Sequence, residues 1–244
     1  HVRTSDVILT GIIYGCAGIA MLLLVGILGY TFIRGIPNVS WEFLSTATST
    51  LKGTVGILGN IINTLYIVVI TLLIATPIGV GSAIYLNEYA KPGRVVRAIE
   101  FTTETLSGIP SIIFGLFGMV FFGNTLGLGY SILTGALTLT LMILPLITRT
   151  TQEALKTVPD SYRSGALGIG ATKWYMIRTI LLPSAMPGIL TGVILAIGRI
   201  VGESAALLFT AGSGYYLAKN LISKICECGG TMTIQLDLFM QKAN

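Results

Sequence analysis

Arg199 and Glu203 are the two ionisable residues of this 244-residue chain that fall inside a long apolar segment, residues 185–209. A charge at the centre of a membrane-spanning helix costs about 2.5–3.5 kcal/mol on insertion scales, so such residues are expected to have a function. In a continuous helix, their spacing would place both side chains on one face, where they neutralise each other. One interpretation is an ion pair that only fixes helix packing. The other is that Arg199 binds an oxyanion, because a guanidinium matches its oxygens with two parallel hydrogen bonds.

No other set of residues indicates catalysis. His1 is the only histidine, and the cysteines form no metal-ligand set: Cys16, Cys226 and Cys228. An enzyme acting inside a membrane would need two carboxylates, a zinc helix or a nucleophile with a base at that depth. We therefore expect no catalytic residue, no metal and no cofactor. The nearest approach to a phosphate-binding P-loop, residues 165–170, has its lysine too late in the sequence, so we expect no ATP hydrolysis by this chain.

The composition indicates a membrane protein. Of all residues, 53% are hydrophobic and 10% are charged, against about a quarter charged in soluble domains. With 15 lysines and arginines, nucleic-acid binding is not expected either. About 20 apolar residues cross a bilayer core. Three uncharged stretches meet that length, residues 7–33, 61–86 and 105–148, and so does the apolar stretch 185–209, which holds Arg199 and Glu203. Residues 105–148 would form a helix of about 66 Å, so they must cross twice, with a turn at residues 123–129.

The sequence therefore predicts an all-α, polytopic membrane helix bundle with five spans. Pro77 lies inside the second span and predicts a kink there. Gly108 and Pro110 have two interpretations: small residues that let helices pack closely, or an interrupted backbone that lines a pathway.

Basic residues orient the spans, because cytoplasmic segments carry an excess of lysine and arginine. With the amino end inside, the inner segments hold Arg3, Lys91, Arg94, Arg97, Arg149, Lys156, Arg163, Lys173 and Arg178. The outer segments hold Arg34, Lys52, Lys219, Lys224 and Lys242. We expect this orientation, which places the carboxyl end outside.

The longest inner segment, residues 150–184, has prolines, glycines and a threonine at positions that predict a helix-turn-helix. Pro159 suits the first position of a helix over residues 160–167, and Gly168 and Gly170 can adopt the positive φ that ends it. Thr172 can cap a second helix over residues 173–181, which Pro183 is expected to end. The small, uncharged apex suits insertion into a groove on another protein.

This segment resembles the cytoplasmic signature of ABC-importer permeases, in which Glu-Ala-Ala is followed by a spaced Gly and by Ile-x-Leu-Pro. The matching positions are Ser164, Gly165, Ala166, Gly170, Ile180, Leu182 and Pro183. Because Ser164 replaces the signature glutamate, a charge contact with the ATPase is either absent or supplied by Arg163 or Asp160. The resemblance implies that residues 150–184 dock on an ATP-binding subunit. It also implies a type I importer permease fold over residues 1–244 as one domain, with a sixth span missing from this sequence.

Two further segments are similar to phosphate-specific transport permeases of the PstA type: residues 108–118, GIPSIIFGLFG, and residues 198–206, GRIVGESAA. This resemblance implies a subunit in the cytoplasmic membrane of a prokaryote that translocates phosphate and contacts membrane lipid. Its implied partners are a homologous PstC-type permease, two PstB-type ATP-binding subunits and an external PstS-type phosphate-binding protein.

In such a permease, Arg199 is expected to bind phosphate, with Glu203 holding Arg199 while the pathway is empty. Arg149 is a second, weaker candidate, at the exit, although its position at the inner end of the fourth span favours a side chain that reaches lipid phosphates. Two other functions stay open. One is a sulfate or molybdate permease, whose signature is similar; the other is a stand-alone secondary anion transporter, although no internal repeat of the usual kind is visible.

Overall fold

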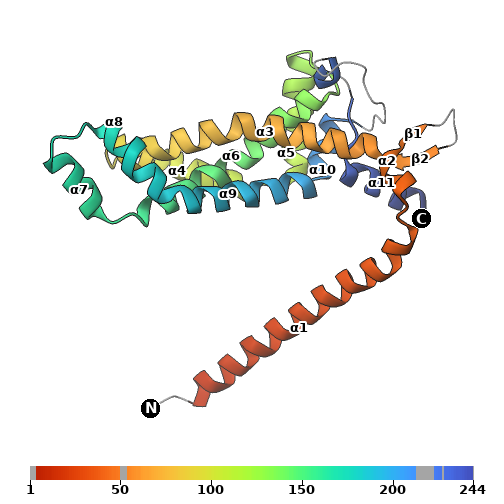
Figure 1. Cartoon of the computed structure of the whole chain (residues 1–244), viewed down its shortest axis with the longest axis horizontal. Helices are drawn as coiled ribbons and strands as arrows, with labels where there is room; N and C mark the ends of the chain where they lie inside the picture. Colours follow the sequence, from red (N-terminus) through yellow and green to blue (C-terminus); the bar gives the residue numbers. More distant parts are fainter. Residues whose placement is uncertain (1–3, 50–53, 213–222, 227, 244) are drawn as a thin grey trace. The chain divides into compact units, whose positions relative to one another are not determined.

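The computed structural model describes residues 4–49, 54–212, 223–226 and 228–243. These residues are helical apart from short connections and one antiparallel hairpin, β1 (Ala47–Ser49) and β2 (Thr54–Ile57), so the predicted all-α class is confirmed. The chain divides into two units, His1–Thr46 and Ala47–Asn244 (Figure 1), which are described separately. Among the bases used to predict orientation, Arg3, Lys52 and Lys219 lie outside the described residues.

The first unit consists of one long helix and a short tail. Helix α1 (Thr4–Gly35) contains the predicted first span and is long and apolar enough to cross a membrane. A 3-10 turn, η1 (Ile36–Asn38), and a short helix, α2 (Trp41–Ser45), follow it. Ser40 caps α2, because its hydroxyl oxygen accepts a hydrogen bond from the backbone N–H of Phe43 at 3.1 Å.

The second unit is built on three long helices that lie side by side: α3 (Leu58–Ile84), α6 (Ile132–Lys156) and α9 (Leu182–Gly202) (Figure 1). Helix α6 is central, because its apolar stretch is 67% buried, against 33% in α3 and 28% in the helix that contains α9. Glycines let these backbones approach closely: Gly79 lies against Ile147, and Gly188 against Ala154. Pro77 lies inside α3 without ending it.

Two apolar clusters hold the second unit together. One cluster lies between α3, α6 and α9 and includes Ile67, Ile143 and Ile200. The other lies where α6 ends and includes Leu155 and Met176. Several buried threonines satisfy their hydroxyls within their own helix, as Thr138 does by donating to the Thr134 carbonyl at 2.8 Å, whereas Thr71 of α3 donates to the Ala136 carbonyl of α6 at 3.3 Å.

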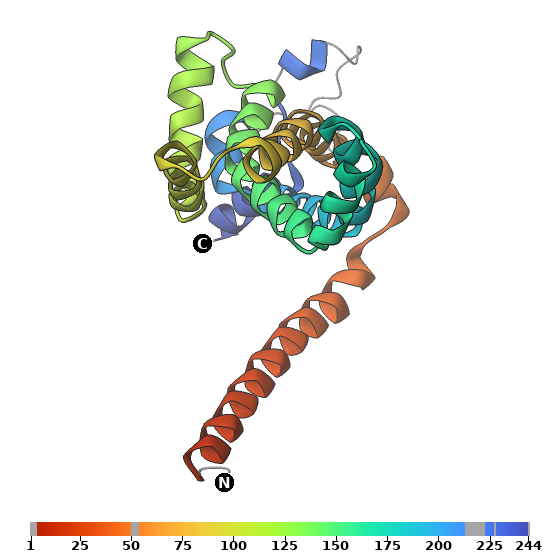
Figure 2. The same cartoon turned by 90° about the vertical axis from the view of Figure 1, so that its left-hand side faces the viewer.

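The predicted third span is not one straight helix. Helix α4 (Arg94–Ser107) and the arm formed by α5 (Ser111–Gly118) and the π-helical η3 (Met119–Thr125) meet at 101°. The bend falls at Gly108 and Pro110, so the backbone is interrupted at these two residues. That this interruption lines a pathway stays a prediction. Looking along the bundle, Figure 2 shows α4 and this arm on one side of it. The described residues thus hold four straight candidate spans, and five if the bent pair counts as one.

Of two other predicted helix boundaries, the structure confirms one and contradicts the other. The predicted turn at residues 123–129 is present, with positive φ at Gly127 and Gly129. Pro183, expected to end a helix, does not: α8 (Lys173–Met176) and the π-helical η4 (Ile177–Leu181) continue into α9 as one long helix. Pro183 falls in the first turn of α9, directly after the π-helical segment, and the first turn of a helix is where proline is tolerated.

The carboxyl-terminal part of the second unit consists of short helices: α10 (Ala205–Thr210), η5 (Ser223–Cys226) and α11 (Met232–Ala243). The buried amide of Asn60 on α3 donates to the Gly230 carbonyl at 3.0 Å, which ties the segment before α11 to the end of the bundle.

Candidate functional site

Arg199 lies on the exposed side of α9, at middle depth in the bundle. Gly188 and Gly192 of α9 face Ala154 and Thr150 of α6, which shows that the two helices run antiparallel. Continuing this register brings Arg199 level with Ile143, near the middle of α6. In the part of the chain that the structure describes, no carboxylate lies within ion-pair distance of its guanidinium. The Arg199 guanidinium is therefore an exposed cation, level with the middle of α6, that pairs with no carboxylate among the described residues.

The predicted pairing of Arg199 with Glu203 is wrong. Helix α9 ends at Gly202, and Glu203 has an extended backbone, with φ −81° and ψ 121°, so the two side chains do not share a helix face. The Glu203 carboxylate instead accepts a hydrogen bond from the backbone N–H of Ala206 at 3.1 Å, at the start of α10. Its carbonyl accepts a second bond from the Thr233 hydroxyl at 2.9 Å. Glu203 thus stabilises the break after α9, because a carboxylate satisfies the free N–H groups of a new helix.

Arg149 makes one ion pair to another helix and one within its own helix, at the exposed side of α6. Its guanidinium lies 3.3 Å from Glu104 of α4 and 3.4 Å from Glu153 of α6. The surrounding hollow, of about 250 Å³, is also lined by Glu100 and Lys156. Three carboxylates against two bases repel a doubly charged anion, so this geometry does not favour an exit site for phosphate.

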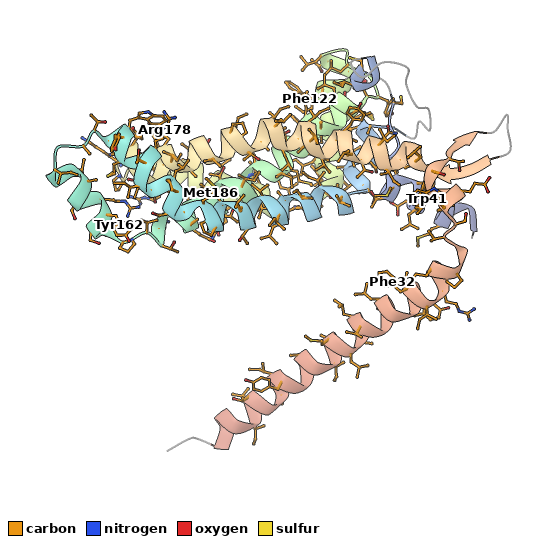
Figure 3. The ribbon with its side chains drawn as sticks, viewed as in Figure 1. Phe32, Trp41, Phe122, Tyr162, Arg178 and Met186 are labelled. Atoms are coloured by element: carbon orange, nitrogen blue, oxygen red, sulfur yellow. The ribbon has the colours of Figure 1, made fainter. Side chains whose placement is uncertain are left out.

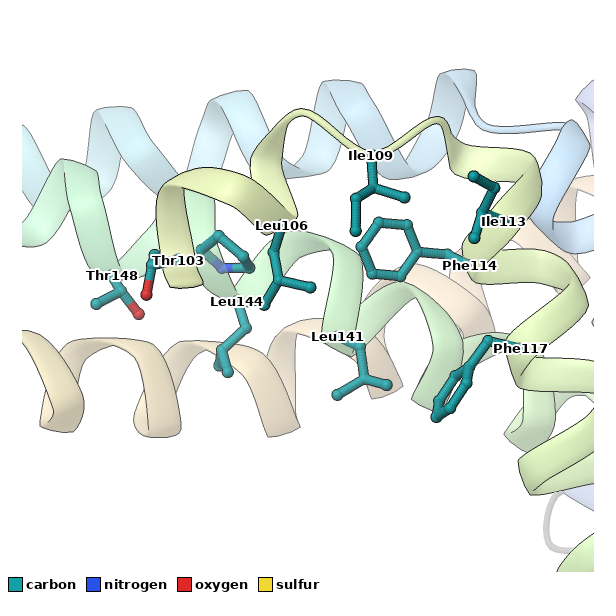
Figure 4. Close-up of a pocket in the computed structure, with 10 residues that line it drawn as sticks. Thr103, Leu106, Ile109, Ile113, Phe114, Phe117, Leu141, Leu144 and Thr148 are labelled. Carbon is teal, nitrogen blue, oxygen red and sulfur yellow. The ribbon is translucent and has the colours of Figure 1, made fainter. Parts of the chain in front are cut away.

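A larger cavity of about 350 Å³ lies in the bend between α4 and α5, against α6 (Figure 4). Leu106, Ile109 and Phe114 line it together with Phe117 and Leu141. Hydroxyls are the only side-chain polar groups in this lining, and burying an unpaired charge in such surroundings costs several kcal/mol or more. The cavity is therefore unsuited to a phosphate ion.

Residues 150–184 form the predicted helix-turn-helix, at the end of the bundle where α6 ends. Helix α7 (Asp160–Gly168) is followed by Gly170 with φ +84°, a conformation that favours glycine. The Thr172 hydroxyl then accepts from the Tyr175 N–H at 3.3 Å and caps α8, as the sequence predicts. Figure 3 shows Tyr162 and Arg178 at this end.

The signature residues of this segment fall into two groups. Ala166 is 4% exposed, and Ile180 and Leu182 are half-buried against the second apolar cluster, so these three hold the segment to the bundle. The exposed members are Ser164, Gly165, Gly170 and Pro183. Sequence reasoning missed the character of the apex, which carries large exposed apolar side chains: Tyr162, Leu167, Ile169, Trp174 and Tyr175. Of these, Ile169 is 87% exposed, so the surface available for docking is apolar rather than small.

Arg163 points into the protein and is not available to replace the signature glutamate. Its guanidinium donates to the Glu88 carboxylate at 3.0 Å, and to the carbonyls of Leu155 and Val158 at 2.9 Å each. It also pairs with Asp160 at 3.0 Å, whose side chain is 98% exposed. Of the two charges considered at sequence level, only Asp160 faces outward. Sequence reasoning missed Glu88, because nothing near it in the sequence points to a partner in residues 150–184.

Comparisons with known proteins agree with this arrangement. Residues 75–226 match the family described as binding-protein-dependent transport system inner membrane component. The probable ABC transporter permease protein YqgI of Bacillus subtilis is 42% identical over 210 residues, covering 86% of this chain and 71% of that protein. The phosphate transport system permease protein PstA of Haemophilus influenzae is 36% identical over 225 residues, covering 92% and 79%.

The structural comparison adds the fold. A crystal structure of the MetNI methionine ABC transporter in inward facing conformations matches with a TM-score of 0.52 and 22% sequence identity. The match covers 77% of this chain and 90% of that chain. At this level of identity, the likeness shows that the two chains share an arrangement of helices.

Proposed function

Because the chain belongs to the family of binding-protein-dependent transport system inner membrane components, and is therefore a multi-pass permease of an ABC importer, we propose that its cargo is inorganic phosphate. The fold is the type I importer permease fold that the sequence predicts. Support for phosphate comes from similarity to relatives named phosphate transport permeases and from a cation suited to an oxyanion at membrane depth.

The proposed machinery is a complex. Both units of the chain, as one permease domain, would pair with a homologous PstC-type permease and receive phosphate from an external PstS-type protein. Two PstB-type subunits would hydrolyse ATP and engage residues 150–184, whose apolar apex supports this role. Nucleotide-driven movement of that segment would then switch the spans between outward and inward openings.

Arg199 is the observation that carries the proposal. Its guanidinium lies at middle depth, is exposed on α9, and has no carboxylate partner among the described residues. An unpaired cation at this depth is costly unless a ligand or a water-filled pathway faces it. Phosphate would be held by charge-assisted hydrogen bonds and released when the pathway opens inward, because one guanidinium binds it weakly.

The test is phosphate uptake by the assembled complex carrying Arg199→Ala, with Arg97→Ala, an exposed arginine on α4, as the matched control. A hydrogen bond to a charged group contributes about 1.5–3 kcal/mol, so uptake should fall at least about tenfold in the first variant. Uptake equal to wild type in Arg199→Ala would refute the role of Arg199. Sulfate and molybdate should be measured in parallel, because preferential uptake of either would favour the alternative permease class.

A further inference from the structure

The ion pair between Glu88 and Arg163 joins two parts of the protein that lie far apart in the sequence. Glu88 belongs to η2 (Tyr85–Tyr89), the π-helical turn that continues α3. Arg163 belongs to α7 in residues 150–184, which we call the docking segment. The two side chains are 5% and 19% exposed, and the carboxylate lies 3.0 Å from the guanidinium. The carboxylates that pair with Arg149, and Asp160, which also pairs with Arg163, are by contrast exposed.

Arg163 connects three elements through one rigid group. Its Nε and Nη2 atoms both donate to Glu88 Oε1, at 3.2 and 3.0 Å. The other donors reach the carbonyls of Leu155 and Val158, at the end of α6. A guanidinium holds all these partners in a fixed fork, so α7, the end of α6 and the end of α3 keep a set spacing.

A second contact reaches the neighbouring residue of the same turn. The Lys173 ammonium, at the start of α8, lies 5.0 Å from the centre of the Tyr89 ring. Both helices of the docking segment therefore contact η2: α7 through the ion pair of Arg163 with Glu88, and α8 through Lys173 and the Tyr89 ring. The bond that closes this turn runs from the Ala90 N–H to the Tyr85 carbonyl, at 2.9 Å. Single π-helical turns inside helices occur frequently at functional sites.

Stability alone is a weak explanation for this pair. Desolvating two charges offsets most of their attraction, and well-packed apolar residues can often replace a buried ion pair without loss. Apolar residues cannot reproduce the fixed directions and lengths of the hydrogen bonds that the Arg163 guanidinium makes.

We propose that Glu88 and Arg163 are positioning residues that transmit movement of the docking segment to α3. The proposal rests on the function proposed above, since it requires an ATPase that moves residues 150–184. A push on α7 would be carried through the fork to η2 and from there along α3, which packs against α6. Removing the charge at Glu88 would leave the ATPase docked and active, while less of its movement would reach the pathway.

The experiment compares Glu88→Gln and Arg163→Gln with wild type in the full complex reconstituted in lipid vesicles. Uptake of inorganic phosphate and hydrolysis of ATP are measured on the same preparation. Glu104→Gln is the matched control, because it removes the carboxylate of another arginine–glutamate pair between two helices. The Glu104 side chain is 69% exposed, whereas that of Glu88 is buried. Coupling free energies between sites correspond to about 5- to 150-fold effects, so we expect phosphate moved per ATP to fall about tenfold in both test variants. The control should stay within about twofold of wild type.

Two outcomes would overturn the proposal. The first is a wild-type ratio of uptake to hydrolysis in Glu88→Gln. The second is failure of Glu88→Gln to assemble, or an equal fall in uptake and hydrolysis, because either would show that the pair only maintains the fold. Glutamine has nearly the same shape as glutamate, so Glu88→Gln still tests the proposal if Arg163→Gln does not fold. If the wild-type complex takes up no phosphate although it hydrolyses ATP, the proposed cargo fails, and the ratio is measured with the oxyanion that the complex does carry.

Discussion

Replacing Gly188 with alanine should loosen the contact between α6 and α9, whereas the same change at Gly198, on the same helix, should not. A Cβ atom at Gly188 would lie 2.6 Å from the Cβ of Ala154 and 3.4 Å from its Cα. Non-bonded carbon atoms pack at about 3.5–4.0 Å, so the helices would have to separate locally by about 1 Å. The methyl group of Ala154 has no rotamer that relieves the clash. A Cβ atom at Gly198 would meet nothing within 4 Å.

The magnitude follows from these two environments. Overpacking a tight contact costs about 1–3 kcal/mol of unfolding free energy. Both variants gain the helix propensity of alanine, up to about 1 kcal/mol, so this term cancels in the comparison between them. In a chain of this size, 1 kcal/mol shifts the melting temperature by about 2–4 °C. The Gly188→Ala chain should therefore melt about 2–12 °C below the Gly198→Ala chain.

Thermal unfolding of the purified chain in detergent, followed by circular dichroism, measures this difference. The comparison is made between two glycine-to-alanine variants of one helix, so effects of the detergent are shared. Equal melting temperatures would refute the close approach of α9 to α6 at Gly188, and with it the register that places Arg199 at middle depth.

Three further changes test other parts of the structure. Asn60→Ala removes the amide that donates to Gly230, so the segment before α11 should be released and limited proteolysis there should accelerate; an unchanged cleavage rate would contradict this docking. Gly170→Ala places a side chain at φ +84°, which costs about 1–2 kcal/mol, so ATP-dependent uptake should fall well below that of Gly165→Ala, whose site is open. Equal uptake by these two variants would show that the turn is not strained. Ser131→Ala removes the hydroxyl that caps α6 and should lower the unfolding free energy by about 1 kcal/mol, measured by chemical denaturation; no change would count against the cap.

Much of the helix-turn-helix in residues 150–184 could be predicted from the sequence. Gly170 and Thr172 act through their own backbone and near neighbours, and such local signals do not depend on the rest of the fold. Pro183 misled because its effect depends on the preceding turn, which is π-helical rather than α-helical. A proline signal predicts an end only where the regular hydrogen bond would otherwise form.

The candidate site was predictable in type but not in geometry. The apolar surroundings of Arg199 make its charge costly and mark it as a candidate functional residue, and the structure leaves it exposed on α9. The assumption of a continuous helix gave the wrong partner for Glu203. Helix α9 ends at Gly202, directly before Glu203, so the Glu203 carboxylate accepts a hydrogen bond from the first turn of α10 instead. No local rule predicted that α9 ends there.

The sequence by itself determined where apolar segments long enough for a membrane occur, and which end of the bundle carries the bases, because composition and run length act locally. Only the tertiary structure decided the 101° bend between α4 and α5, the inward turn of Arg163 and its pairing with Glu88. Those two residues lie 75 positions apart, and each side chain takes its direction from the element packed against it. Helix patterns specify which face is apolar, whereas a partner for a buried charge depends on how separate helices meet.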